Sequence, residues 1–152
     1  MCDLARLSRR FKEAVTQLYR DDGQLVDGKV HEQAITAQLA RHLDSGLEGE
    51  GFDVDCEYNR DYREEDDIKR DQDRARMRPD IIVHRRWTCE NLLAIEVKPY
   101  WSIADRTEDL ARLEYLTGDA FKYALGVHLE IGSDGPTFTW FADGSQIGDP
   151  DA

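Results

Sequence analysis

Cysteine, proline and lysine are all scarce in this chain of 152 residues, and long apolar runs are missing. The three cysteines, Cys2, Cys56 and Cys89, are far apart and odd in number, which argues against a disulfide framework or a zinc ribbon. No apolar stretch approaches the roughly 20 residues that span a bilayer, and the N-terminus is polar and charged rather than like a secretory signal. We therefore expect one domain over residues 1–152, with reduced thiols, in the cytoplasm.

The shortage of lysine gives the chain an unusual charge. It has 5 lysines and 15 arginines against 20 aspartates and 12 glutamates, for a net charge of −12. An acidic surface repels polyanions in dilute buffer. Surfaces rich in aspartate and poor in lysine are typical of proteins from high-salt cytoplasms, where the Debye length falls to roughly 3 Å at 1 M. The composition favours a halophilic protein, although a GC-rich genome would lower the lysine count in the same way.

Several kinds of chemistry have no residues to support them. The sequence contains no glycine-rich phosphate loop, no nucleophile elbow and no paired cysteines. Acidic residues alternate from Asp53 to Glu57 as in a calcium loop, but Tyr58 stands where the sharp turn needs glycine. The histidines show no metal-ligand spacing; they are His31, His42, His84 and His128. Only His84 is of interest, because it shares a strand face with Asp80.

Two short apolar runs, at residues 78–84 and 92–98, carry the most informative polar residues. Both are rich in β-branched side chains and read as strands. Because side chains alternate along a strand, Glu96 and Lys98 share one face while Ile95 and its apolar neighbours share the other. A hairpin between the runs would place Asp80 beside Glu96. This arrangement predicts a divalent-metal site with a cation next to it, although an ordinary surface pair on a solvated sheet face remains the alternative.

The residues Pro79-Asp80 and Glu96-Val97-Lys98, each in an apolar strand, resemble the PD-(D/E)XK nuclease superfamily, also called restriction-endonuclease-like. In that family the acidic pair binds Mg²⁺ or a similar ion, and the lysine positions or activates the attacking water. The resemblance implies that Asp80 and Glu96 are metal ligands and that Lys98 is the catalytic lysine.

The looser resemblance, from about His31 to about Ile131, implies an activity and a set of partners. The implied activity is that of a Mg²⁺- or Mn²⁺-dependent endonuclease that hydrolyses DNA phosphodiester bonds. The alternative is a catalytically silent subunit or regulator of a DNA-processing or defence complex that keeps the same fold. Superfamily enzymes that cut both strands commonly act as dimers, so a homodimer is also expected.

Glu32 is a third candidate ligand. The stretch Val30 to Leu43 predicts a helix whose buried stripe contains Ile35 and Leu39, and Glu32 lies on that same face. A carboxylate on a core-facing stripe is costly unless a cation meets it. Many members of the resembled family carry a glutamate on the helix before the first core strand, so the resemblance implies that Glu32 reaches the metal. Alternatively, Glu32 complements the helix dipole.

The remaining pattern predicts the order helix–strand–strand–strand–helix–strand with one added strand. This is an α/β (α+β) fold with a mixed central sheet flanked by helices, and its order is that of the resembled core. An amphipathic helix over residues 1–20 precedes this core and is broken at Asp21-Asp22-Gly23. The expected later elements are a half-exposed strand at 52–58, a helix at 107–116 ended by Gly118, strands at 123–131 and 136–141, and a loose tail at 142–152.

Three surfaces are candidates for partner contacts. The highly charged stretch from Asp61 to Arg78 is either a solvated face or a phosphate-binding segment; its arginines are Arg70, Arg74, Arg76 and Arg78. Tyr100 and Trp101 either stack on a base or cap a core. The apolar stripe from Leu4 to Leu18 is expected to pack on the domain itself and is the plausible surface for a homodimer.

Overall fold

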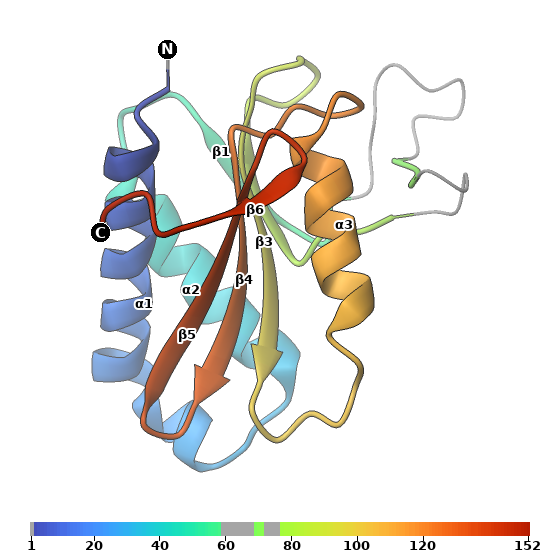
Figure 1. Ribbon diagram of the computed structural model, residues 1–152. Coiled ribbons are helices and arrows are strands. Elements are labelled where there is room, and N and C mark those ends of the chain that lie inside the picture. Colours follow the sequence, from blue (N-terminus) through green and yellow to red (C-terminus); the bar gives the residue numbers. More distant parts are fainter. Residues whose placement is uncertain (1, 59–68, 72–76) are drawn as a thin grey trace.

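The computed structural model describes residues 2–58, 69–71 and 77–152. Within these residues the chain forms one mixed sheet with helices on both faces (Figure 1). The sheet is ordered β1 (Asp53–Cys56), β2 (Ile81–His84), β3 (Asn91–Pro99), β4 (Leu125–Gly132), β5 (Gly135–Ala142) and β6 (Ser145–Ile147). Strands β3 and β4 are parallel and the other neighbours are antiparallel. The predicted α+β class is confirmed.

Helices α1 (Leu4–Asp27) and α2 (Glu32–Gly46) cover one face of the sheet (Figure 1). Asp3 caps α1 by accepting a hydrogen bond from the backbone N–H of Arg6 at 3.0 Å. The apolar stripe of α1 packs into the main core against β4 and β5, where the rings of Phe11 and Trp140 meet edge to face. The stripe proposed as a homodimer surface is therefore used inside the chain.

The predicted end of α1 at residues 21–23 is wrong, because the helix continues to Asp27 across a kink at Asp22. Two interactions hold the segment after the kink. Val26 is buried in the core, and the Asp22 carboxylate lies 2.6 Å from the Nε2 atom of His42 on α2. Tertiary contacts thus override the helix-breaking tendency of the Asp-Asp-Gly sequence.

Helix α3 (Thr107–Thr117) covers the opposite face and connects the parallel strands β3 and β4 (Figure 1). Its predicted bounds and its end at Gly118 are confirmed within one residue. The helix lies close to β4: a Cβ atom added at Gly126 would come within 2.9 Å of the Thr117 Cγ2 atom. The small core on this face holds residues from α3, β2, β3 and β5 together with Phe121 and Tyr123.

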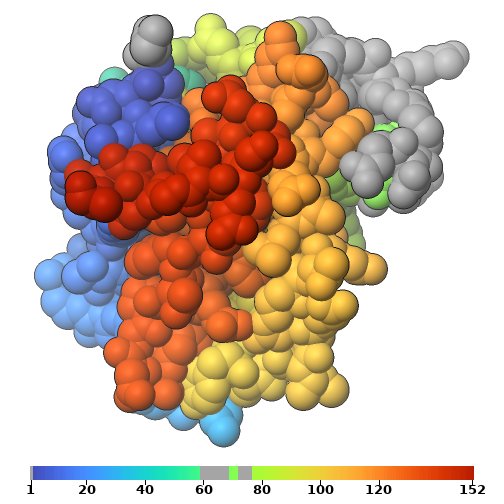
Figure 2. All heavy atoms as spheres, viewed as in Figure 1, coloured from blue at the N-terminus to red at the C-terminus, as the bar shows by residue number. Residues whose placement is uncertain are grey.

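The C-terminal segment is ordered rather than the loose tail expected from the sequence. An Asp143-Gly144 turn with positive φ at both residues returns the chain, and β6 then pairs with β5. The segment continues across α1 (Figure 2), where Asp149 pairs with Lys12 and Asp151 with Arg9.

Most of the charged stretch from Asp61 to Arg78 lies outside the described residues, including Arg74 and Arg76. Of its described arginines, Arg70 is half-buried and Arg78 is exposed. Lys69 departs from the expectation of a solvated face, since it is 3% exposed among aromatic rings and its ammonium lies 4.9 Å from the Phe121 ring centre. None of the described helices is both long and apolar enough to cross a bilayer.

Candidate metal and phosphate site

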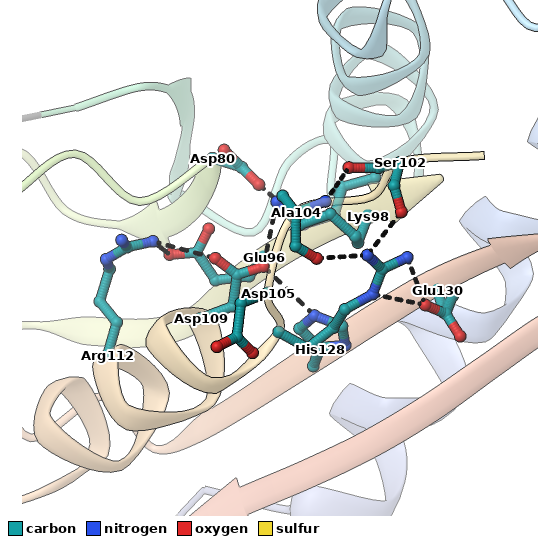
Figure 3. Close-up of polar contacts among 12 residues, drawn as sticks. Asp80, Glu96, Lys98, Ser102, Ala104, Asp105, Asp109, Arg112, His128 and Glu130 are labelled. Carbon is teal, nitrogen blue, oxygen red and sulfur yellow. Dashed lines mark hydrogen bonds and ion pairs between the residues drawn. The ribbon is translucent and has the colours of Figure 1, made fainter. Parts of the chain in front are cut away.

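Asp80 and Glu96 meet at the junction of β2 and β3. The strand register pairs Ile81 with Ile95, so Asp80 falls opposite Glu96 on the face covered by α3. The Asp80 carboxylate accepts a hydrogen bond of 2.8 Å from the backbone N–H of Val97, which fixes it at the start of the strand. The sequence-based prediction that the hairpin brings these carboxylates together agrees with this geometry (Figure 3).

The two carboxyl groups are close enough to perturb each other strongly. Glu96 is 1% exposed, and burial together with the negative charge of Asp80 raises its pKa well above 4.5. Burial also raises the pKa of Asp80, against the opposing effect of the Val97 N–H. A hydrogen bond between the two side chains favours the proton on Glu96 and the charge on Asp80. This is the electrostatic signature of an acidic pair that lacks sufficient positive charge.

Lys98 follows Glu96 on the same face of β3 and pairs with α3. Its ammonium lies 3.3 Å from Asp109 Oδ2, and the Lys98 side chain is only 13% exposed. The same Asp109 oxygen lies 3.3 Å from Nε2 of His128, the β4 residue that the parallel register sets beside Glu96. Burial alone would raise the pKa of Asp109, but the His128 hydrogen bond and the Lys98 charge hold it below its usual value.

The positive charge of Lys98 also reaches Asp80 and Glu32. Its field lowers the pKa values of both carboxyl groups, although in each case burial has the larger, opposite effect. Glu130 lies beside Lys98 in the strand register but is bound by Arg106, at 2.9 Å from Nε and 2.8 Å from Nη2. Because Arg106 binds Glu130, Lys98 forms its ion pair with Asp109 instead.

Arg112 supplies the second cation of the cluster. Its Nη1 atom lies 2.6 Å from Glu96 Oε1 and 3.5 Å from Asp109 Oδ1 (Figure 3). Burial by itself would lower the pKa of Arg112, but Glu96, Asp109 and Asp80 together raise it above its usual value. The guanidinium thus lies in the field of three carboxylates.

Glu32 approaches the cluster from the N-terminus of α2. It is half-buried, and its pKa is raised by burial and then by the charge of Asp80. Glu32 and Asp80 line one cavity of about 410 Å³ together with Cys56, Glu57 and the first turn of α2. Glu32 is therefore electrostatically coupled to Asp80, in contrast to a residue that only complements the helix dipole.

The donor set fits a hard divalent cation with an open coordination sphere. Among the described residues, no three His, Cys, Asp or Glu side chains converge closely enough to form a complete metal cage. Mg²⁺, however, usually keeps several waters and binds through one or two carboxylates together with substrate phosphates. Asp80 and Glu96 supply two such carboxylates, and their mutual repulsion is what a divalent cation would relieve. Glu32 faces the same cavity as Asp80, as a further oxygen donor.

Three residues of the cluster, Asp109, Arg112 and His128, were not identified from the sequence. Asp109 and Arg112 are spaced i, i+3 on α3 and could have been recognised as a polar stripe on the buried side of that helix. His128 interrupts an otherwise apolar run between Val127 and Leu129, which is an unusual place for a polar side chain.

His84, expected on the Asp80 face, and the aromatic pair Tyr100 and Trp101 make other contacts. His84 pairs with Asp55 at 2.7 Å, on the strand edge near Tyr58. Trp101 packs against the main core, as the capping alternative predicts, whereas Tyr100 is 38% exposed. Comparison of the sequence with protein-family models and with curated proteins finds no match.

Proposed function

We propose that this protein is a Mg²⁺- or Mn²⁺-dependent nuclease that hydrolyses phosphodiester bonds in DNA. The observation that carries the proposal is the convergence of Asp80, Glu96 and Lys98 on one sheet face, where the register sets Asp80 opposite Glu96 and the two carboxyl groups shift each other's pKa. These are the residues of the Pro-Asp and Glu-Val-Lys motifs that resemble the PD-(D/E)XK superfamily.

The arrangement of secondary structure supports the same proposal. From α2 to β4 the chain runs helix–strand–strand–strand–helix–strand, which is the order of the resembled core. The first three strands are antiparallel neighbours, and α3 carries the chain to a fourth strand parallel to the third. The motif residues lie at the junction of the second and third of these strands.

Each residue has a separate role in the proposed reaction. Asp80 and Glu96, with Glu32 as a further oxygen donor, would hold the ion so that its open coordination positions face the cavity beside α2. A bound divalent ion supplies Lewis-acid polarisation of the phosphate and a water of lowered pKa. Lys98 is no ligand, because an ammonium only donates hydrogen bonds. It orients the attacking water or stabilises charge that develops on the phosphate.

Asp109 and His128 position Lys98 in this proposal. The lysine side chain is long and flexible, and the carboxylate of Asp109 fixes its ammonium at 3.3 Å. His128 in turn holds Asp109. The two residues act through Lys98 and need not contact the substrate.

The acidic composition fits DNA binding if the protein works in concentrated salt. At 1 M salt the Debye length is roughly 3 Å, so the net charge of −12 repels DNA much less than in dilute buffer. Activity is therefore expected to persist or rise in molar KCl, where the phosphate contacts of a basic nuclease are already weakened.

Cleavage of supercoiled and branched DNA tests the proposal. The wild-type protein should cut with Mg²⁺ or Mn²⁺ and not with chelator, across a series from dilute buffer to about 3 M KCl. Asp80→Ala should lose both Mn²⁺ binding and cleavage. A wild-type protein that binds Mn²⁺ yet cuts none of these substrates at any salt concentration would overturn the proposal.

One observation favours a second candidate, a catalytically silent subunit of a DNA-processing or defence complex. Both Glu96 and Lys98 are engaged in ion pairs within the chain, to Arg112 and Asp109, as they would be if the cluster served only to hold α3 on the sheet. This candidate predicts DNA or protein binding that is insensitive to chelator. A cleavage reaction that depends on Lys98 would exclude it.

A further inference from the structure

Arg112 occupies the position of a counter-ion at the proposed metal site. Its guanidinium is 2.6 Å from Glu96 and also experiences the charges of Asp80 and Asp109. Asp80 and Glu96 are the proposed ligands, so a side chain of this protein already provides positive charge where a divalent ion would bind.

The two partners of this ion pair differ in their freedom to move. The Glu96 side chain is 1% exposed and projects from the middle of the sheet, whereas the Arg112 side chain is 28% exposed on α3. A half-exposed arginine can swing its guanidinium into water without burying any charge. Glu96, at 1% exposed, has no adjacent solvent into which it can turn. When the pair opens, Arg112 is therefore the residue that moves.

Arg112 also has an alternative partner. Asp109, one turn earlier on α3, already lies 3.5 Å from Arg112 Nη1 through its Oδ1 atom. The other oxygen, Oδ2, holds Lys98 at 3.3 Å. Asp109 is thus shared between the arginine that covers Glu96 and the lysine of the proposed reaction.

We infer that Arg112 is a built-in competitor of the divalent ion: it covers Glu96 in the ion-free protein, and it moves from Glu96 toward Asp109 when the ion binds. The inference rests on the proposed metal site, and it adds a regulatory step to that site. Two positive charges cannot share Glu96 at hydrogen-bonding distance without strong repulsion in a buried setting. The divalent ion carries twice the charge of the guanidinium, so the ion displaces it from Glu96.

The displacement leaves Lys98 in place. A guanidinium that turns onto Asp109 meets its Oδ1 atom, which already lies 3.5 Å from Arg112, while the Oδ2 atom keeps Lys98 at 3.3 Å. Both cations then share Asp109, and Lys98 keeps the position that the proposed reaction needs. In the ion-free protein, Lys98 and Glu96 both stay engaged.

Binding of Mn²⁺ alone tests the inference without reference to cleavage. Calorimetric titration in about 2 M KCl suppresses loose binding to the acidic surface. Arg112→Met should bind Mn²⁺ about tenfold more tightly than the wild type, a difference of about 1.4 kcal/mol. Arg112→Lys, whose shorter ammonium makes a weaker pair with Glu96, should fall between the two. If Arg112 instead helps to hold Glu96 as a ligand, Arg112→Met will bind equally or more weakly, and the inference fails.

Arg106→Met is the matched control. Arg106 immediately precedes α3 and also binds a carboxylate on the sheet, but that carboxylate is Glu130. If Arg106→Met raises Mn²⁺ affinity as much as Arg112→Met does, the gain is a general effect of removing positive charge and the inference is overturned. An unchanged affinity in Arg106→Met supports local displacement.

A measurement on the wild-type protein covers the case in which Arg112→Met does not fold. The side-chain Nη1–H resonance of Arg112, the group that pairs with Glu96, can be assigned by its absence from Arg112→Lys. Its hydrogen exchange should be slow in the ion-free protein and faster with saturating Mg²⁺, because Asp109 is more exposed than Glu96. Equal exchange in the two states overturns the inference. Loss of cleavage with an intact displacement would refute only the nuclease proposal, and cleavage without displacement would refute only this inference.

Discussion

The two faces of the central sheet are built from the same strands but differ in kind. On the side of α1 and α2, β3 presents Leu93, Ile95 and Val97, all fully buried in one continuous apolar core. On the side of α3 the alternate positions include Glu96 and Lys98, which are buried among other charged groups. The first face is stabilised by area removed from water, and the second must balance its charges. The larger apolar core therefore lies on one face and most of the charged cluster on the other, with Glu32 joining Asp80 from the N-terminus of α2.

The largest expected effect is a loss of activity without a loss of ion binding, caused by a substitution on the α3 face. Lys98→Ala should lower the rate of DNA cleavage by about 10²- to 10³-fold, the usual effect of removing one group that stabilises charge in the transition state. Mn²⁺ affinity, measured by calorimetry, should change little because Lys98 is no ligand. Lys122→Ala is the control, since that lysine is exposed beyond the end of α3. Cleavage by Lys98→Ala at the wild-type rate would remove Lys98 from the mechanism.

Adjacent positions of β3 should respond in opposite ways to substitution. Ile95→Ala should lower the free energy of unfolding by about 2 to 5 kcal/mol, because it leaves a cavity in the apolar core. At about pH 4.5, where the folded protein keeps Glu96 protonated, Glu96→Gln should change it by no more than about 1 kcal/mol, since the amide can still accept from Arg112 and can donate to Asp80. Urea denaturation of the ion-free proteins measures both values. Equal losses from the two substitutions would show that the faces do not differ as described.

The pH dependence of stability should distinguish the same two variants. Glu96 has a raised pKa in the folded state, so above its unfolded value of about 4.5 the folded protein binds more protons than the unfolded chain does. The wild type therefore loses stability as pH rises from that value through the folded pKa, and Glu96→Gln does not. In chelator, the stability advantage of Glu96→Gln should grow across this window. A constant difference between the two proteins would contradict the raised pKa.

The smallest effect is expected where charges pair on the exposed surface. The ion pair between Lys12 and Asp149 is about one-third exposed at each partner. Asp149→Asn should lower the free energy of unfolding by less than about 1 kcal/mol in dilute buffer, and by still less in molar KCl, where the pair is screened. Thermal melting at both salt concentrations measures the change. A large effect that survives in molar salt would mean that the C-terminal segment contributes more than this ion pair.

The sequence predicts the parts of the site that depend on residues close together in the chain. Strand alternation and a short hairpin are sufficient to place Asp80 opposite Glu96, with Lys98 on the same face. The contributions of Asp109 and His128 could not be foreseen in this way. They reach the cluster through the α3 crossover and the parallel register, which the spacing of residues along the chain does not specify.

The fold shows the same division between local and long-range signals. Helix α3 is predicted to within one residue and α2 to within three, because their apolar stripes are periodic. The end of α1 was misplaced because it depends on tertiary contacts: the burial of Val26 and the pairing of His42 with Asp22. The C-terminal hairpin was missed although Asp143-Gly144 is a strong turn signal. In that case the signal was present in the sequence and was overlooked.

The position of α1 has a consequence for the order in which the protein can assemble during synthesis. This helix leaves the ribosome long before β5, yet its aromatic anchor Phe11 packs against Phe138 and Trp140 of that strand. Until β5 emerges, the apolar side of α1 lacks these partners, and contacts between such distant parts of a chain form slowly. A nascent chain stalled before β5 should therefore expose apolar surface and be a target for chaperones.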